Sequence, residues 1–373
     1  MLQVVISSPG TVDVREAKLP EPGPGEIRVR TRAVGICGSD LHALAGAHPF
    51  IDLPCIPGHE VVGTVEALGP AVTEPAVGTR VLLEPNLVCG ECPYCVSGRY
   101  NLCEKLRVVG CQTAGAMADA FIAPAARFHV VPEGISDTEA AIVEPLSTAV
   151  HAVRLAGELA GRRVAVLGGG TIGLLTLVAA REAGAGPVAV SEPKEAKRKR
   201  AERLGAAFTC DPTAEDPVTA IREALGGRPD AIFDCVSTQG SVSQAIRLAE
   251  NGGAVIVVGV AERDVTVPLP IIQDREVSLA GSAMYVREDV LRSIGLWRRA
   301  RWTPRRSSRP ASRWPTRRRR SAVPPRGTRS RCTLLLTTGS RTSGGTHERG
   351  GHGQGKARRA RTNLGVRLVR RRG

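Results

Sequence analysis

A glycine-rich turn between an apolar strand and a helix constrains the fold of this chain more than any other feature. Gly168, Gly170 and Gly173 form a GxGxxG pattern directly after the apolar run 162–168 and at the start of a predicted helix, 172–183. Such a turn lets backbone amides and the helix N-terminus receive a pyrophosphate. For the glycines alone, a tight packing turn is the alternative interpretation.

A carboxylate supports the dinucleotide interpretation. Glu192 lies 19 residues after the last of these glycines, at the end of the predicted strand 187–192. There it could bond both ribose hydroxyls and repel a 2′-phosphate, which favours NAD over NADP. NADP stays open because three nearby cations could accept that phosphate, although cations on an exposed helix usually form a solvated face: Lys194, Lys197 and Arg198.

The hydrophobic pattern changes near residue 150. Residues 1–150 contain short β-type runs broken by Gly and Pro, such as 26–36 and 59–69, and predict a mostly β domain. Residues 151–296 alternate strands and helices and predict a doubly wound parallel sheet. The class is therefore α/β with two domains. The later predicted strands are 231–236, 254–260 and 276–282, followed by a helix at 287–296.

Four cysteines crowd into the segment 89–103. Cys89, Cys92, Cys95 and Cys103 have the spacing CxxCxxC followed by seven residues and a fourth cysteine. Four thiolates close a tetrahedral Zn²⁺ shell and leave no position for a substrate, so the spacing predicts a structural zinc site. Loss of this zinc should disorder the segment rather than affect catalysis directly. Four unrelated buried thiols are the alternative.

A second set offers mixed sulfur, nitrogen and oxygen ligands. Cys37 lies in CGSDLH, His59 and Glu60 lie in PGHE, and Glu144 begins EPLSTAVHA. Mixed shells with an exchangeable position suit catalytic zinc. Taken singly, each residue also has an ordinary structural interpretation, as a small core residue, a loop histidine or a helix-start carboxylate.

These motifs, with GRYNLC at 98–103 and the glycine-rich turn, occur in an order that resembles the zinc-dependent medium-chain alcohol and polyol dehydrogenases, such as sorbitol dehydrogenase. The resemblance covers about four-fifths of the chain. It implies a GroES-like catalytic domain over residues 1–150 and a Rossmann NAD-binding domain over residues 151–296. It also implies two zinc ions per subunit and a dimer or tetramer.

The resemblance assigns roles to the mixed ligand set. It implies that Cys37 and His59 bind catalytic zinc, that Glu60 and water complete the shell, and that Glu144 lies beside the metal and can exchange into it. Zinc would lower the pKa of a substrate hydroxyl as a Lewis acid, and hydride would pass to NAD⁺. The carboxylates favour a secondary alcohol, polyol or vicinal diol as substrate.

The resemblance also implies a proton path and a nicotinamide site. Ser39 and His42 correspond to a relay from the alkoxide to solvent, whereas a turn hydrogen bond and a surface helix position are their ordinary interpretations. The strand ends 258–260 and 282–284 are expected to line the nicotinamide, and four of their residues are our candidates: Val258, Val260, Ser282 and Met284.

The charge of the chain is very unevenly distributed. The formal net charge is +15. Residues 297–373 hold 24 Lys and Arg against the single acid Glu348, and so carry +23, which leaves −8 for residues 1–296. From Trp297 the apolar periodicity stops, so we expect a disordered basic tail with neither helix nor strand.

A frameshift offers an origin for this tail. A shifted codon can be formed from the last base of one codon and the first two bases of the next. In this frame Trp302 followed by Thr303 encodes Asp, and Trp314 followed by Pro315 encodes Ala. Synonymous choices allow residues 297–321 to be re-read as LASGALDPAPLVTPGFPLADAAEAF and residues 330–334 as VKVHL, which resembles the family's C-terminal segment. We interpret this as a single-base change near Leu296. A natural basic tail is the alternative.

Three functional classes follow. The first is the dehydrogenase, with an alcohol or polyol as its partner and a cytoplasmic location, because no secretory signal is visible and the cysteines suit a reducing compartment. The second is a catalytically impaired zinc and NAD-binding protein. The third is nucleic-acid binding by the tail, which we disfavour because the tail has no recognisable binding motif. No run of 18 apolar residues is present, so no membrane partner is expected.

Overall fold

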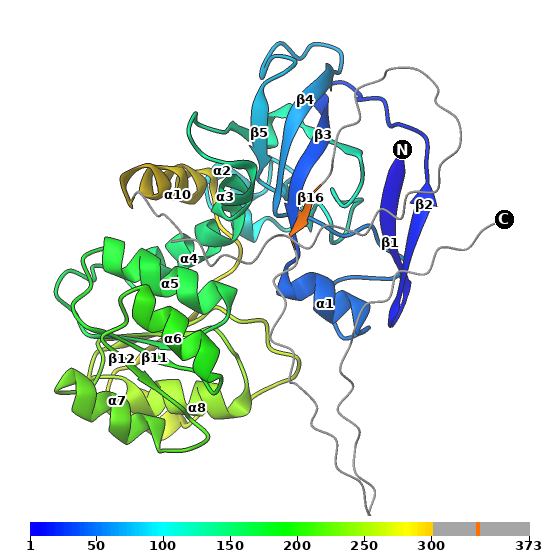
Figure 1. The fold of residues 1–373 in the computed structure, drawn as a ribbon. Coiled ribbons are helices and arrows are strands. Elements are labelled where there is room, and N and C mark those ends of the chain that lie inside the picture. The colour runs from blue at the N-terminus through cyan, green and yellow to red at the C-terminus, as the bar shows by residue number, and fades with distance from the viewer. Residues whose placement is uncertain (301–332, 336–373) are drawn as a thin grey trace, which may run out of the picture.

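The computed structural model describes residues 1–300 and 333–335. It has two parts, a β-rich domain that contains the N-terminus and a parallel sheet covered by helices (Figure 1). These are the GroES-like domain and the Rossmann domain expected from the sequence. Among the described helices, none combines the length and apolar character needed to span a bilayer.

The Rossmann sheet has six parallel strands in the order β12-β11-β10-β13-β14-β15. Its three central strands are buried at every residue, as parallel strands covered on both faces must be. The strand bounds are β10 Val164–Leu167, β11 Val188–Ser191, β12 Phe208–Cys210, β13 Ala231–Asp234, β14 Ala254–Val257 and β15 Ser278–Gly281. The helix bounds are α5 Thr171–Glu182, α6 Glu195–Arg203, α7 Pro217–Leu225, α8 Gln239–Leu248 and α9 Leu269–Asp274.

The strand order reverses direction between β10 and β13. Leu167 at the end of β10 is in register with Ser191 of β11 and with Asp234 of β13. The carboxyl ends of these strands therefore meet at one edge of the sheet. Ligands of open α/β sheets bind at such a switch point.

The GroES-like domain is organised around a sheet in the order β16-β3-β4-β5-β9, with β8 also paired to β3. Its strand bounds are β3 Glu26–Gly35, β4 Val61–Leu68, β5 Arg80–Leu83, β8 Ala120–Pro124 and β9 Phe128–Val130. Alternate residues of β3 face a core that includes Ile27 and Val29, both without exposed surface. Two small ladders, β1 Leu2–Ser8 with β2 Thr11–Glu16 and β6 Asn86–Leu87 with β7 Arg107–Val108, complete the β structure. The short helical elements are α1 Gly38–Leu44, α2 Pro93–Val96, η1 Tyr100–Leu102, η2 Ala125–Arg127 and α3 Asp137–Ala141.

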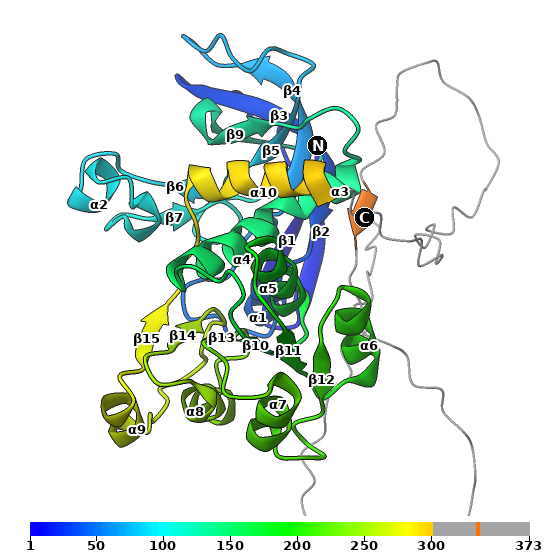
Figure 2. The ribbon, with the colours of Figure 1, turned by 90° about the vertical axis from the view of Figure 1, so that its left-hand side faces the viewer.

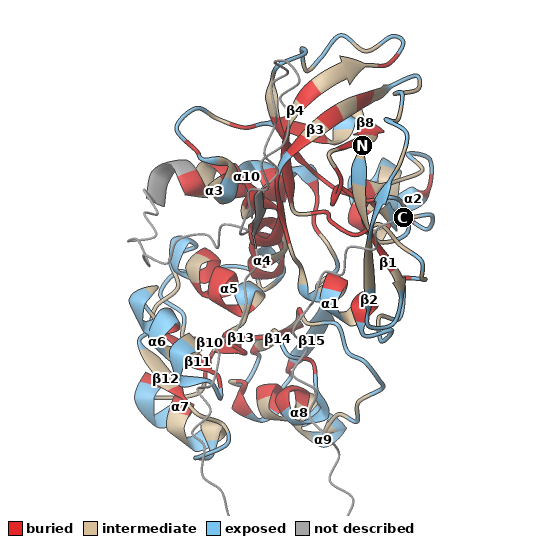
Figure 3. Ribbon diagram, turned by 45° about the vertical axis from the view of Figure 1, so that its right-hand side comes forward, coloured by how far each residue is buried: buried red, intermediate tan, exposed pale blue. Residues whose placement is uncertain are grey.

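Two helices join the domains. Helix α4, Val143–Leu155, is buried along most of its length (Figure 3) and packs on α5. Helix α10, Arg287–Ala300, begins where the sequence predicts but continues past the expected end at 296. Its extension has a physical reason, because Trp297 is an apolar residue that joins a buried cluster with Val62, Leu82 and Tyr285. Although it follows the Rossmann strands in the sequence, α10 packs on α4 and on the core of the GroES-like domain.

The expectation that residues 297–373 contain no helix or strand is wrong in two places. The first is the end of α10, and the second is strand β16, Thr333–Leu335, which pairs in parallel with Ala33–Gly35 of β3. A β-prone, apolar TLL run can satisfy backbone groups at the open edge of β3. The remainder of the predicted disordered or frameshifted tail, 301–332 and 336–373, lies outside the described residues.

Candidate functional site

The glycine-rich turn has the backbone geometry of a nucleotide cradle. Gly168 follows β10 with φ of 95°, a left-handed conformation that favours glycine. A Cβ at Gly173 would overlap the carbonyl oxygen of Gly168, so only glycine permits this approach of helix to strand. Gly170 precedes α5, and a Cβ there would meet nothing within 4 Å. The turn thus leaves open space at the N-terminus of a 12-residue helix, which fits a pyrophosphate.

Glu192 lies at the edge of this cradle. The residue is only 4% exposed, its Oε2 accepts a hydrogen bond from Gly169 N at 2.8 Å, and its Oε1 accepts one from Lys194 N at 2.9 Å. Two of the three cations noted in the sequence, Lys197 and Arg198, already have partners. Arg198 Nη1 donates to Glu192 O at 2.7 Å and to Asp211 Oδ2 at 3.0 Å, and Lys197 Nζ lies 3.5 Å from Glu192 Oε2.

The proposed nicotinamide residues follow two neighbouring strands. Val258 N donates to Asp234 O at 2.8 Å just after β14, and Ser282 N donates to Val257 O at 2.8 Å just after β15. The hydroxyl of Ser282 is buried without a hydrogen-bond partner. Val260 is 59% exposed, and Met284 has φ of 49°. All four candidates therefore follow the carboxyl ends of these two strands.

The four cysteines of the segment 89–103 converge. Their sulfur atoms lie within 4.8 Å of one another. Sulfurs around a tetrahedral Zn²⁺ with Zn–S bonds of about 2.3 Å would lie about 3.8 Å apart, and the structure places Cys89 Sγ 3.9 Å from Cys95 Sγ and 3.5 Å from Cys103 Sγ. Backbone N–H groups of Cys89 and Lys105 donate to Cys103 Sγ. The donor set and its spacing fit structural zinc.

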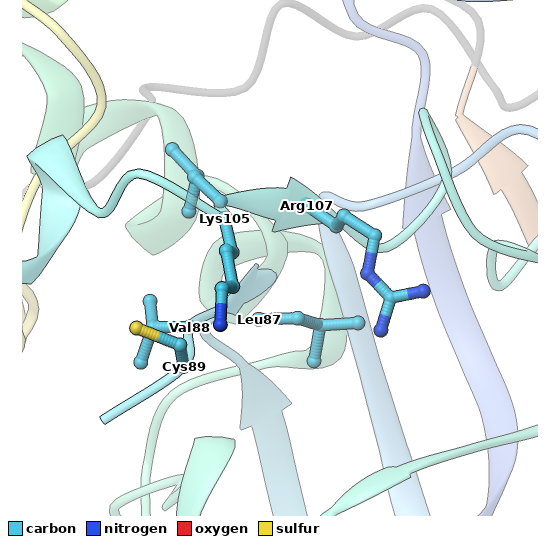
Figure 4. A pocket seen from close by; sticks show the side chains of 6 residues that line it. Leu87, Val88, Cys89, Lys105 and Arg107 are labelled. Atoms are coloured by element: carbon cyan, nitrogen blue, oxygen red, sulfur yellow. The ribbon is translucent and has the colours of Figure 1, made fainter. Parts of the chain in front are cut away.

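A groove of about 470 Å³ opens beside the four-cysteine segment (Figure 4). It contains only one of the predicted site residues, Cys89. The exposed Lys105 ammonium pairs with Glu91 Oε1 at 2.7 Å. We assign no catalytic role to the groove, whose lining is Leu87, Val88, Cys89, Lys105, Leu106 and Arg107.

The mixed ligand set converges in the GroES-like domain. Ligand atoms of Cys37, His59 and Glu60 lie within 4.8 Å of one another. Cys37 precedes α1, where Asp40 Oδ2 accepts its N–H at 2.8 Å, and the other two residues precede β4. A Cβ at Gly35 would overlap Glu60 Oε2, so glycine is needed for this carboxylate to enter. Sulfur, nitrogen and oxygen donors at this separation fit a catalytic zinc.

The electrostatics of the cluster also fit a cation. Burial, followed by the negative charge of Glu144, raises the pKa of Glu60 to about 7. Burial alone would lower the pKa of His59, but the Cys37 thiolate and other nearby groups raise it well above its ordinary value. The buried Nδ1 of His59 has no hydrogen-bond partner in the described part of the chain. The cluster lacks compensating positive charge, which a bound metal ion would supply.

Glu144 lies beside this cluster rather than within it. The residue is 7% exposed and occupies the first turn of α4. Its Oε1 accepts a hydrogen bond from the hydroxyl of Tyr285 at 2.6 Å, and burial raises its pKa. Tyr285 has no exposed surface and was not among our candidates. No local motif distinguishes this tyrosine from an ordinary core residue, so the sequence gives no signal for it.

The proposed relay residues share α1. Within the part of the chain that the structure describes, the buried hydroxyl of Ser39 has no hydrogen-bond partner. His42 Nδ1 lies 3.5 Å from Glu262 Oε1, a residue of the loop between β14 and α9. Glu262 was not predicted. The contact places α1 against the loop that follows β14, one of the strands of the Rossmann sheet.

Comparison with known proteins agrees with this geometry. Residues 23–133 match the alcohol dehydrogenase GroES-like domain, and residues 171–297 match the zinc-binding dehydrogenase family. An L-threonine 3-dehydrogenase of Thermococcus kodakarensis is 37% identical over 68% of this chain and 73% of its own length. The chain belongs to the zinc-dependent medium-chain alcohol and polyol dehydrogenases.

Further relatives of this dehydrogenase span different substrates and cofactors. A sorbitol dehydrogenase of Arabidopsis thaliana is 37% identical over 74% of this chain and 78% of its own length. A structure described as a zinc-binding dehydrogenase of Sinorhizobium meliloti, bound to NADP, superposes with a TM-score of 0.75 at 38% identity. That likeness covers 79% of this chain and 87% of the other. The family thus establishes an oxidoreductase that uses zinc.

Proposed function

We propose that this dehydrogenase oxidises a secondary alcohol, polyol or vicinal diol and transfers the hydride to NAD⁺. The observation that carries the proposal is the convergence of the ligand atoms of Cys37, His59 and Glu60, in a domain whose helix α1 contacts the loop after β14 through His42 and Glu262. Zinc, when bound, supplies a Lewis acid that lowers the pKa of the substrate hydroxyl, and NAD⁺ supplies the hydride acceptor.

The chain's own residues orient the reactants and move the proton. Cys37, His59 and Glu60 would hold the metal at the inner face of the GroES-like domain. Ser39, with its free buried hydroxyl, would accept the proton released by the substrate. His42, which is partly exposed at the mouth of the site, would pass that proton to solvent.

The choice of NAD rests on Glu192. Its carboxylate occupies the edge of the cradle where the adenosine ribose is expected, and Arg198 is held by backbone oxygens and by Asp211. A 2′-phosphate would face this carboxylate without a free guanidinium to receive it. Because a relative binds NADP, both cofactors belong in the test.

We further propose two zinc ions per subunit, one at each converging cluster. The four sulfurs around Cys89 and the mixed set around Cys37 form separate groups of ligand atoms in the described chain. Metal analysis of the purified protein is expected to give two equivalents. A single equivalent would contradict the proposal.

The remaining proposals concern assembly and location. We propose a homo-oligomer, supported by β15, the edge strand of the described sheet, whose four residues are all exposed. Light scattering after size exclusion would test it.

A cytoplasmic location is supported by the nine described cysteines, all of them free. Detection of the protein outside the cytoplasm after fractionation would contradict it.

The deciding assay supplies the full chain with NAD⁺ or NADP⁺ and a panel of secondary alcohols, polyols and vicinal diols, and follows absorbance of the reduced cofactor. Turnover with NAD⁺ is expected. Cofactor binding without turnover on any alcohol would instead indicate a catalytically impaired binding protein. We also propose that residues 297–373 result from a single-base change near Leu296, which sequencing of genomic DNA across the codons for residues 294–302 would test.

A further inference from the structure

The segment 283–287 crosses from the Rossmann sheet to α10. We call it the crossing segment. It begins immediately after Ser282, which is bonded to β14, and it contains Met284, whose φ of 49° is unusual for a residue other than glycine. Strained backbone of this kind persists only where its surroundings hold it in place. The contacts that hold the crossing segment therefore determine where the end of β15 lies.

Three of these contacts come from the lobe that contains the four cysteines, residues 86–108. Asn101 Nδ2 donates to Ala283 O at 2.9 Å, and Asn86 Nδ2 donates to Tyr285 O at 2.8 Å. The N–H of Arg287 donates to the hydroxyl of Tyr100. Figure 2 shows the yellow chain rising from β15 to α10 beside the lobe that bears α2, β6 and β7. The lobe thus binds the beginning, middle and end of the segment.

Asn101 and Tyr100 are themselves fixed by the lobe. They form η1, which leads directly into Cys103. Asn101 is 5% exposed, and its amide nitrogen also lies 3.4 Å from His151 Nε2. The Tyr100 hydroxyl donates to the buried Glu84 at 2.7 Å. Neither side chain can turn away without losing two hydrogen bonds, so the position of η1 is transmitted to the crossing segment.

The crossing segment also contacts residues near the proposed zinc and cofactor sites. Tyr285 donates to Glu144, beside the metal ligands, and Ser282 directly precedes the segment. A continuous set of contacts therefore runs from Cys103 through Asn101 to Ala283, and from there to both the strand end and Glu144.

We propose that the four-cysteine lobe positions the cofactor-binding strand end, with Asn101 and Tyr100 as positioning residues that clamp the crossing segment. The lobe then has a second role beyond its own stability. The proposal rests on the proposed function in one respect, that Ser282 and Met284 line the nicotinamide. A purely structural lobe would affect the stability of the protein without a selective effect on cofactor affinity.

The test compares the full chain with its Asn101→Ala variant. Amide hydrogen exchange of residues 283–287 is measured by mass spectrometry, and the NAD⁺ dissociation constant by calorimetry. We expect exchange about tenfold faster and the dissociation constant about tenfold higher, as for the loss of one buried hydrogen bond, with zinc content unchanged. Ser97→Ala is the matched control, since this hydroxyl donates only to Tyr94 O within the lobe at 3.2 Å.

Unchanged exchange in Asn101→Ala would overturn the proposal, as would faster exchange with unchanged NAD⁺ affinity. Should that variant fail to fold, Tyr100→Phe keeps the ring beneath Arg127, 5.0 Å from its guanidinium, but removes the acceptor for Arg287 N–H, and the same two changes are expected. If the unsubstituted chain binds no NAD⁺, the proposed function fails, while the exchange measurement still decides whether the lobe clamps the segment.

Discussion

The hydroxyl of Tyr285 donates a hydrogen bond to Glu144 at 2.6 Å, and both residues are buried. This contact joins the segment between β15 and α10 to helix α4, which precedes the first strand of the Rossmann sheet. Glu144 has no other hydrogen bond from a side chain among the described residues. The carboxylate therefore depends on a residue 141 positions away in the sequence.

Replacing Tyr285 by Phe is expected to destabilise the protein by about 1–3 kcal/mol, because it leaves a buried acceptor without its donor. Thermal unfolding followed by circular dichroism would measure the change. Tyr94→Phe, at a residue that is 38% exposed, is the control and should leave the transition unchanged. An unaltered transition in Tyr285→Phe would show that water replaces the hydroxyl at no cost.

Ser39→Ala is expected to reduce turnover about a hundredfold while zinc content stays at the level of the unsubstituted chain, because a proton relay contributes on that order. Among residues 1–300 its hydroxyl has no hydrogen-bond partner whose loss could disturb the fold. Steady-state kinetics with parallel metal analysis would measure both quantities. Equal losses of turnover and zinc would mean that Ser39 has only a structural role.

Cys37→Ser is expected to remove one zinc equivalent per subunit and abolish turnover, because the mixed site loses its thiolate ligand. Cys92→Ser is the matched substitution in the other cluster and should release the second equivalent. Atomic emission on desalted protein would distinguish them. If Cys37→Ser released both equivalents, the two sites would not be independent.

Glu192→Ala is expected to weaken NAD⁺ binding about tenfold, because the carboxylate that would bond the ribose is gone. The ratio of NAD⁺ to NADP⁺ affinity should also fall, because that carboxylate would repel a 2′-phosphate. Titration with each cofactor would measure both constants. Glu195→Ala, at an exposed carboxylate paired with Lys199, is the control. A variant that keeps its NAD⁺ preference would place the ribose elsewhere.

Acid is expected to weaken the network around Glu84. Burial would raise the pKa of Glu84, but hydrogen bonds from His129 and Tyr100, with the charge of Arg127, hold it below its ordinary value. A carboxylate with a lowered folded-state pKa stabilises the fold above its unfolded pKa, and this stabilisation is lost as pH falls through the folded-state value.

The window for this effect therefore lies below about pH 4. Glu84→Gln should be less stable at neutral pH and show a flatter loss of stability between neutral and acid pH. Urea unfolding at several pH values would measure it. Glu91→Gln, which removes an exposed ion pair, is the control. Parallel curves for Glu84→Gln and the unsubstituted chain would contradict the assignment.

The features that the sequence predicts well are local. A GxGxxG turn after an apolar strand, the bounds of β3, β10, β11 and α5, and the two ligand clusters all depend on residues near one another or on motif spacing. The short strand β12, Phe208–Cys210, was not predicted because three residues show no periodicity.

The features that escaped prediction depend on distant pairs. Asn101 with Ala283, Tyr285 with Glu144, and His42 with Glu262 meet only when the two domains are assembled. No periodicity or motif marks such partners. The end of α10 was missed for the same reason, because Trp297 stays helical through burial against the other domain rather than through local preference.

The packing of α10 has a consequence for synthesis on the ribosome. The cluster that contains Val62 and Leu82 is completed by Tyr285, Val290 and Trp297. The first domain thus remains unfinished until more than two hundred further residues have been translated and the second domain has taken shape. During this interval an apolar face of the nascent chain is uncovered. We therefore expect chaperone dependence during translation to be concentrated between the emergence of β4 and that of α10.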